Sequence, residues 1–111
     1  MYEYNAEIIR WVDGDTVLVR LDLGFHCQKI ERIRLARINV WELNDTSSYK
    51  RRWARSARFK INKLCPKGSK VKIKSEKNPK QDMYARYIGE VYFQGKNLSN
   101  KILKFKGVKK I

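Results

Sequence analysis

The chain has 111 residues, of which 42% are hydrophobic and 12% are aromatic, and this is enough for the core of one small domain. It carries 26 Lys and Arg against 11 Asp and Glu, a formal net charge of +15, with only six glycines and two prolines. These values exclude a multidomain enzyme, a disordered chain and a collagen-like fibre, and they predict one domain, residues 1–111, that folds on its own.

Alternating apolar residues predict three strands in the first part of the chain. Residues 6–12 form the first strand and residues 16–23 form the second. Asp13-Gly14, which lies between them, is a turn dipeptide that favours positive φ, so the two strands are expected to form a hairpin. After a second turn, residues 30–38 form a third strand, and the three strands can build a meander.

The rest of the chain predicts one long helix, two strands and a short second helix. Polar residues 44–48 supply N-cap side chains, and apolar residues then recur at helical spacing from Trp53 to Cys65. The later elements are a fourth strand over 70–74, a fifth strand over 84–93 and a short helix over 98–105. This order fits a mainly β fold, a five-stranded Greek-key barrel of the OB type with two helices.

The charge is distributed unevenly along the chain. Residues 1–49 hold six basic and eight acidic side chains (net −2), whereas residues 50–111 hold 20 basic and three acidic ones (net +17). This asymmetry favours nucleic acid as the partner over a membrane surface, because the basic residues do not lie on a strongly amphipathic helix. No obligate protein partner is indicated.

The N-terminal residues do not have the layout of a targeting segment. Residues 1–10 lack the basic-then-apolar pattern of a signal peptide, and no apolar run approaches the roughly 20 residues that span a bilayer. We therefore expect a cytoplasmic chain as written, and an exported chain trimmed of its signal is the alternative.

Cysteine and histidine are too few to build a common catalytic or zinc site. Cys27 and Cys65 are far apart and neither belongs to a CxxC motif, so both are expected to be buried thiols. A single histidine, His26, excludes a structural zinc site and a Ser-His-Asp or Cys-His hydrolase. If the chain is an enzyme, carboxylates must carry out its acid and base chemistry.

Three short motifs place charged side chains beside turns or strand ends. Residues 13–16, Asp-Gly-Asp-Thr, put two carboxylates at a hairpin turn, where they can act as hard oxygen ligands for Ca²⁺ or Mg²⁺. Residues 34–42 place an arginine within a strand, followed by an amide oxygen and a carboxylate just past the strand end. Residues 83–86 put another arginine at the start of the last strand. Each motif alone is also compatible with an ordinary turn or with solvated charges.

Together, and in this order, the three motifs resemble the staphylococcal nuclease (thermonuclease) family. The quoted parts are Val12-Asp13-Gly14-Asp15-Thr16-Val17, Arg34-Leu35-x-x-Ile38-Asn39-x-x-Glu42 and Tyr84-x-Arg86-Tyr87-Ile88-Gly89. The resemblance extends from about Ala6 to Val108. It implies a Ca²⁺-dependent endonuclease that hydrolyses DNA and RNA with little sequence preference and leaves 3′-phosphate ends.

The resemblance also implies how a calcium ion would be held. Asp15 corresponds to the principal carboxylate ligand, Asn39 to the second ligand and the Val40 carbonyl to a third. Asp13 and Thr16 would orient these ligands without binding the metal themselves.

Other positions correspond to groups that act on the substrate. Glu42 matches the carboxylate that orients or deprotonates the attacking water, and Arg34 and Arg86 match the arginines that hold the phosphate. Tyr84 would lie alongside the nucleotide, which favours single-stranded or locally unpaired substrate. Further phosphate contacts are expected from basic residues at the start of the long helix, Lys50, Arg51 and Arg52.

Three positions depart from the family pattern. Asn39 stands where the best-known member has a carboxylate, which predicts weaker calcium binding. Arg37 replaces a glycine or small apolar residue and Trp41 replaces a proline, so the loop that carries Glu42 could follow a different path. Two alternatives therefore stay open: a non-catalytic OB-type nucleic-acid-binding domain, and a structural protein that packs against RNA in a large assembly.

Overall fold

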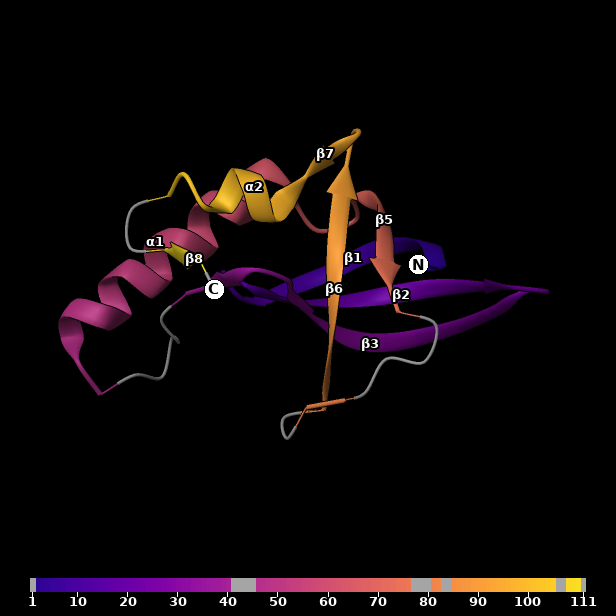
Figure 1. Ribbon diagram of the computed structural model, residues 1–111, viewed down its shortest axis with the longest axis horizontal. Helices are drawn as coiled ribbons and strands as arrows, with labels where there is room; N and C mark the ends of the chain where they lie inside the picture. Colours follow the sequence, from indigo (N-terminus) through magenta and orange to yellow (C-terminus); the bar gives the residue numbers. More distant parts are fainter. Residues whose placement is uncertain (1, 41–45, 77–80, 83–84, 106–107, 111) are drawn as a thin grey trace.

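The computed structural model describes residues 2–40, 46–76, 81–82, 85–105 and 108–110 (Figure 1). The elements are, in chain order, β1 (Tyr2–Asp13), β2 (Thr16–Gly24), β3 (Cys27–Leu35), β4 (Ile38–Asn39), α1 (Ser48–Leu64), β5 (Lys70–Ser75), β6 (Arg86–Phe93), β7 (Lys96–Asn97), α2 (Leu98–Ile102) and β8 (Lys109–Lys110). Neither helix in this part of the chain is long and apolar enough to cross a membrane.

Five strands close into a barrel of the OB type, which confirms the predicted fold. β1 pairs antiparallel with β2 and β5, β2 pairs with β3, and β5 pairs with β6. The parallel pairing of β3 with β6, from Arg32 opposite Arg86 to Leu35 opposite Gly89, closes the barrel. The short β7 extends β6, and β4 pairs with β8 in a separate two-stranded sheet.

Side chains from the barrel interior and from one face of α1 form the core. The alternating pattern puts Val17 and Val19 of β2 and Ile33 and Leu35 of β3 inside, each no more than 3% exposed. Trp11 of β1 is also buried, and its Nε1 donates a hydrogen bond to the Cys65 carbonyl at 2.8 Å. This bond joins the end of α1 to β1 and satisfies the polar atom of a buried indole.

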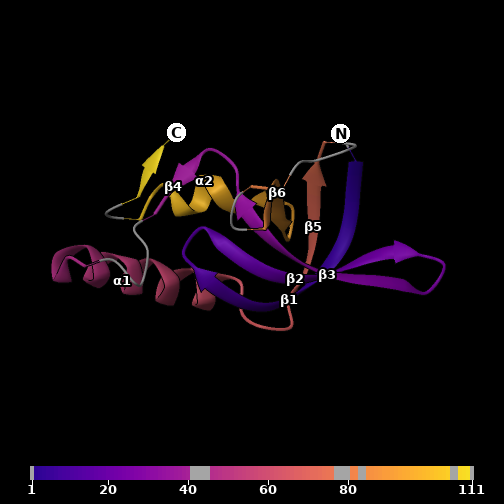
Figure 2. The same cartoon turned by 90° about the horizontal axis from the view of Figure 1, so that it is seen from below.

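The long helix begins and ends where its capping groups predict. The Ser47 side chain accepts a hydrogen bond from the Lys50 N–H, and the Cys65 N–H donates to the Ile61 carbonyl. Ala54, Ala57 and Ile61 form its buried face. Figures 1 and 2 show that the last turns of α1 lie against the barrel, whereas its first turn projects away from the strands.

The predicted third strand is divided in the structure. Residues 30–38 were expected to be one strand, but β3 ends at Leu35 and β4 begins at Ile38. Arg37 between them has φ of 70°, a left-handed conformation that an extended strand cannot contain. The break turns the chain after Leu35 and directs Asn39 and Val40 along a new path.

Gly14 is needed for a reason other than the predicted one. The hairpin between β1 and β2 is confirmed, with Asp13 opposite Thr16, but Gly14 is not among the positive-φ glycines. A Cβ atom at Gly14 would lie 2.9 Å from Ala57 Cβ and 3.0 Å from Val40 Cγ1. The absent side chain therefore lets α1 and Val40 pack directly on the turn.

The two cysteines differ in exposure. Cys65 is fully buried as expected, and burial raises the pKa of its thiol from 9.0 to about 11. The expectation that Cys27 is buried is wrong, because it lies at the exposed end of the β2–β3 hairpin. This hairpin extends beyond the barrel, and Phe25 at its tip is 99% exposed.

Candidate active site

The β1–β2 turn places two polar side chains in the interior. Asp15 is 5% exposed and Thr16 is 2% exposed, although both belong to a polar hairpin turn. The Leu35 N–H donates to the Asp15 carbonyl at 2.8 Å, and Thr16 lies opposite Arg34 in the β2–β3 pairing. Backbone hydrogen bonds therefore hold the turn against the end of β3, which brings the first and second sequence motifs together.

The Asp15 carboxylate has a hydrogen-bond donor at each oxygen. The Thr16 hydroxyl donates to Oδ1 at 3.1 Å, and the Val40 N–H donates to Oδ2 at 3.2 Å. Arg34 Nη2 lies 3.8 Å from the same Oδ2. These partners compensate the burial of the carboxylate and fix its orientation.

Arg34 gathers oxygen atoms around one nitrogen. Its Nη2 donates to the Ile38 carbonyl at 3.2 Å and to Asn39 Oδ1 at 3.4 Å, in addition to its contact with Asp15. The Arg34 side chain is 16% exposed, so this cation is largely withdrawn from water. Three oxygens from three residues thus surround a single positively charged group.

Arg86 approaches the same centre from β6. Its Nη1 donates to the Thr16 hydroxyl at 3.3 Å, so this hydroxyl links Arg86 to Asp15. Asp82 holds the other side of the guanidinium, with Nε 2.9 Å from Oδ2, and it also accepts from the Arg86 N–H at 3.0 Å. The parallel pairing of β3 with β6 makes this approach possible, because it sets the two arginine-bearing strands side by side.

The oxygen atoms around Arg34 fit a hard cation by their chemistry. Calcium takes six to eight oxygen ligands, and here a carboxylate, an amide and a carbonyl already converge on a cationic nitrogen that acts as a stand-in. The set is weak in charge, since the described residues contain no group of three or more His, Cys, Asp or Glu side chains that could hold a metal. A metal ion would need further oxygens from phosphate or water, and Arg34 would have to move aside.

The remaining predicted site residues are placed as follows. Val40 contributes its N–H to Asp15, and the carbonyl in contact with Arg34 belongs to Ile38. Asp13 ends β1 opposite Thr16 and is half-buried. Lys50, Arg51 and Arg52 lie in the first turns of α1, about 8–10 Å along the helix axis from Ala57, which contacts the turn. Glu42 and Tyr84 lie outside the described residues.

Sequence reasoning missed two groups at the site. The first is Asp82, whose only sequence signal is a carboxylate four residues before Arg86. The second is the Ile38 carbonyl, which no side-chain pattern can reveal. Both position an arginine, so both affect where the two guanidinium groups point.

Arg37 lies outside the cluster and stabilises the strand break. Its Nε lies 2.9 Å from Glu90 Oε1 and its Nη1 donates to Asn100 at 3.2 Å. The Ser99 hydroxyl donates to the Ala36 carbonyl at 2.8 Å beside it. Arg37, which departs from the family pattern, thus links the strand break to β6 and α2. Its side chain does not enter the cluster around Asp15.

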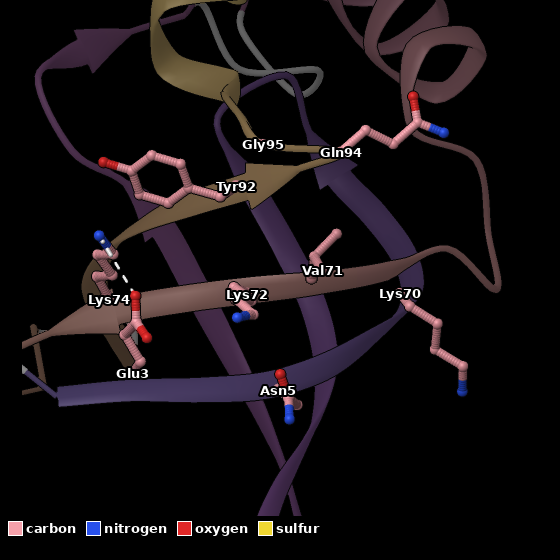
Figure 3. A pocket seen from close by; sticks show the side chains of 9 residues that line it. All are labelled: Glu3, Asn5, Lys70, Val71, Lys72, Lys74, Tyr92, Gln94 and Gly95. Atoms are coloured by element: carbon pink, nitrogen blue, oxygen red, sulfur yellow. Dashed lines mark ion pairs between the residues drawn. The ribbon is translucent and has the colours of Figure 1, made fainter.

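A groove of about 460 Å³ lies elsewhere, on the outer face of β1, β5 and β6 (Figure 3). Lys74 on its wall pairs with Glu3 at 3.3 Å and lies 4.8 Å above the Tyr92 ring, and Lys70 pairs with Glu7 at 2.7 Å. The carboxylates neutralise most of the positive charge in this groove. None of its lining residues belongs to the Asp15 cluster, so we regard the groove as a separate feature.

A comparison with protein families matches residues 32–108 to the family described as staphylococcal nuclease homologue. The matched region covers more than half of the chain and includes Arg34, Asn39, Val40 and Arg86. The β1–β2 turn with Asp15 and Thr16 precedes it and is joined to it by the contacts described above. A comparison with curated proteins found no matching sequence.

Proposed function

The chain belongs to the family of staphylococcal nuclease homologues, and on that premise we propose that it is a Ca²⁺-dependent endonuclease. It hydrolyses phosphodiester bonds of DNA and RNA with little sequence preference and leaves 3′-phosphate ends. The observation that carries the proposal is the pair of guanidinium groups, Arg34 and Arg86, that flank the buried Asp15 and Thr16.

The two arginines bind the phosphate that is cleaved. Forked, permanently charged donors suit the oxygens of a phosphodiester, and they bind more strongly as negative charge accumulates in the transition state. Arg86 is already oriented by Asp82, and Arg34 exchanges its contacts with Ile38 and Asn39 for phosphate oxygens. Loss of either guanidinium is expected to slow cleavage on the order of 10²–10³-fold.

The oxygen ligands of the cluster hold the calcium ion. Asp15, Asn39 and a backbone carbonyl, which we assign to Val40, are the protein ligands, while Asp13 and Thr16 orient them. When bound, calcium supplies Lewis-acid polarisation of the phosphate. Because Asn39 brings no charge, calcium binding by the protein alone is expected to be weak, and the phosphate strengthens it by adding oxygens and drawing Arg34 away.

Glu42 acts on the attacking water. In this proposal its carboxylate orients the water or takes its proton for attack in line with the leaving 5′ oxygen. Tyr84 lies alongside the nucleotide in a single-stranded or locally unpaired segment, and Lys50, Arg51 and Arg52 contact the nucleic-acid backbone farther from the cleaved bond.

The test compares Glu42→Ala with a matched carboxylate variant, Glu76→Ala, which removes an exposed acidic side chain. We expect wild type and Glu76→Ala to cleave plasmid and single-stranded DNA in Ca²⁺ and to be inactive in EDTA. Glu42→Ala should lose on the order of 10²–10⁴-fold in rate while its DNA affinity changes little. Product ends that a polymerase extends only after phosphatase treatment would identify the 3′-phosphate.

One observation favours a second candidate, a non-catalytic nucleic-acid-binding domain of the same fold. Arg34 already occupies the space among the oxygens of Asp15, Ile38 and Asn39, where a cation would have to enter. If that arrangement persists when nucleic acid is bound, the chain binds without metal. Binding of DNA by wild type that is unchanged by Ca²⁺ and is followed by no cleavage would support this candidate.

A further inference from the structure

The outer face of α1 is rich in basic side chains. Arg52, Arg55 and Lys63 are all exposed, and they recur at the spacing of one helical face, opposite the buried Ala54, Ala57 and Ile61. Phe59 lies between them and is 62% exposed. The 17 residues of α1 contain seven Lys and Arg and no Asp or Glu, so nothing within the helix offsets this charge.

Arg52, Arg55 and Lys63 have no acidic partner among the residues that the structure describes. Within the described ranges, the ion pairs involve residues of the barrel strands and the loops beside them, and Arg52, Arg55 and Lys63 take part in none of them. The groove of Figure 3 differs from this helix face, because Lys70 and Lys74 in the groove each have a glutamate partner. On α1, Lys63 instead lies 5.1 Å above the Phe59 ring, which leaves its charge available.

This arrangement costs stability in the isolated protein. Cations in the first turn of a helix oppose its dipole, and the first turn of α1 contains Lys50 and Arg51 without an acidic residue. Like charges three or four residues apart, such as Arg52 and Arg55, repel each other as well. A polyanion bound along the helix would relieve both costs, so the face has the electrostatic character of a binding surface.

We propose that the outer face of α1 binds the phosphate backbone of double-stranded DNA. A 17-residue helix is about 25 Å long and 10–12 Å across, dimensions that suit the major groove of B-form DNA. Arg52 to Lys63 place cations over about 16 Å of this length. The first turn of α1 projects away from the barrel in Figures 1 and 2, and Arg52, Arg55 and Lys63 are exposed, so this face is accessible to a duplex.

The shape of the face favours a duplex over a single strand. Single strands are usually bound in a basic groove lined with several stacking aromatic rings, whereas this surface is a convex rod with Phe59 as its central aromatic residue. A membrane surface fits less well, because a helix that lies in a bilayer needs a free apolar face, and the apolar face of α1 is buried in the core. The proposal concerns binding alone and holds whether or not the chain cleaves its ligand.

The test measures duplex binding in EDTA, so that cleavage plays no part. The variant is Arg55→Gln/Lys63→Gln, and the matched control is Lys70→Gln/Lys72→Gln, which removes the same charge from β5. Circular dichroism confirms that each variant is folded. We expect the plot of log affinity against log salt for the α1 variant to become shallower by about 1.8, as the loss of two phosphate contacts requires, with weaker binding at all salt concentrations. The control should change the slope by less than half as much.

Binding to single-stranded DNA and to anionic lipid vesicles distinguishes a duplex from the two other possible partners of this face. Single-stranded DNA should lose less affinity than the duplex in the α1 variant, and vesicles of anionic lipid should bind more weakly than the duplex at equal salt. Equal slopes for the α1 variant and the control would overturn the proposal, as would tighter binding to vesicles. The nuclease proposal is tested separately by cleavage in Ca²⁺, so failure of one does not imply failure of the other.

Discussion

At the scale of single residues, the cluster around Asp15 depends on side chains that have two partners each. Thr16 donates to Asp15 and accepts from Arg86, and Arg34 contacts Asp15 and Asn39. The motifs allowed these residues to be predicted as one site, because their types and order match a known pattern. The roles of Asp82 and of the Ile38 carbonyl depend on rotamers and backbone direction, which the sequence does not specify.

Arg34→Ala should bind calcium more tightly than the wild type when no nucleic acid is present. The substitution removes a positive charge 3.8 Å from Asp15 Oδ2 and frees Asn39 Oδ1, and both oxygens belong to proposed calcium ligands. We expect a gain on the order of tenfold in affinity, which calorimetry or terbium luminescence can measure. Arg37→Ala is the control, because that arginine points to Glu90 and Asn100. Unchanged or weaker binding by Arg34→Ala would mean that the metal does not share these oxygens.

The two cysteines should react at very different rates. The thiolate is the reactive species, and burial both shields Cys65 and raises its pKa to about 11, whereas Cys27 is exposed. Because the pKa in the folded state lies above 9.0, burial of the neutral Cys65 thiol stabilises the fold below pH 9, and that contribution is lost as the pH rises toward 11. Iodoacetamide at neutral pH should modify one thiol quickly and the second only after unfolding. Rapid double labelling of native protein would contradict this account.

At the scale of elements, the strands and the long helix could be predicted because each has a strong local pattern. Val17, Val19 and Ile33 alternate with polar residues, and Ser47 marks the start of α1. The break between β3 and β4 could not be predicted in this way. Arg37 has φ of 70°, and its side chain contacts Glu90 and Asn100, which are distant in sequence, so the local pattern carries no signal of the contacts at this break.

The packing of α1 on the β1–β2 turn gives a prediction at this scale. Gly14→Ala should destabilise the fold by about 1–3 kcal/mol, since its Cβ would lie 2.9 Å from Ala57 Cβ. Ala57→Gly alone should cost about 1 kcal/mol through helix propensity. In the double variant the clash with Ala57 is gone. The loss in the free energy of unfolding, measured by urea denaturation, should therefore be smaller for the double variant than the sum of the losses in the two single variants. Additive costs would show that the turn and the helix are not in direct contact.

At the scale of the whole molecule, different residues determine the fold and the net charge. The barrel follows from apolar alternation, whereas the net charge of +15 belongs to its surface and predicts a polyanionic partner. Crowding of like charges is already visible at α2, where Lys96 and Lys104 lower the pKa of Lys101. Composition predicted the excess of positive charge, but the paired lysines of the barrel could be distinguished from the exposed Arg52, Arg55 and Lys63 of α1 only once the fold was known.

The central claim is that the Asp15 cluster hydrolyses phosphodiester bonds with calcium. The most direct measurement is single-turnover cleavage of an end-labelled, single-stranded oligonucleotide with protein in excess, in Ca²⁺ and in EDTA. We expect cleavage in Ca²⁺ alone, a loss on the order of 10²–10³-fold in Arg34→Ala at saturating protein, and nearly full activity in Arg37→Ala. An oligonucleotide that is bound but stays intact in Ca²⁺ would contradict the claim.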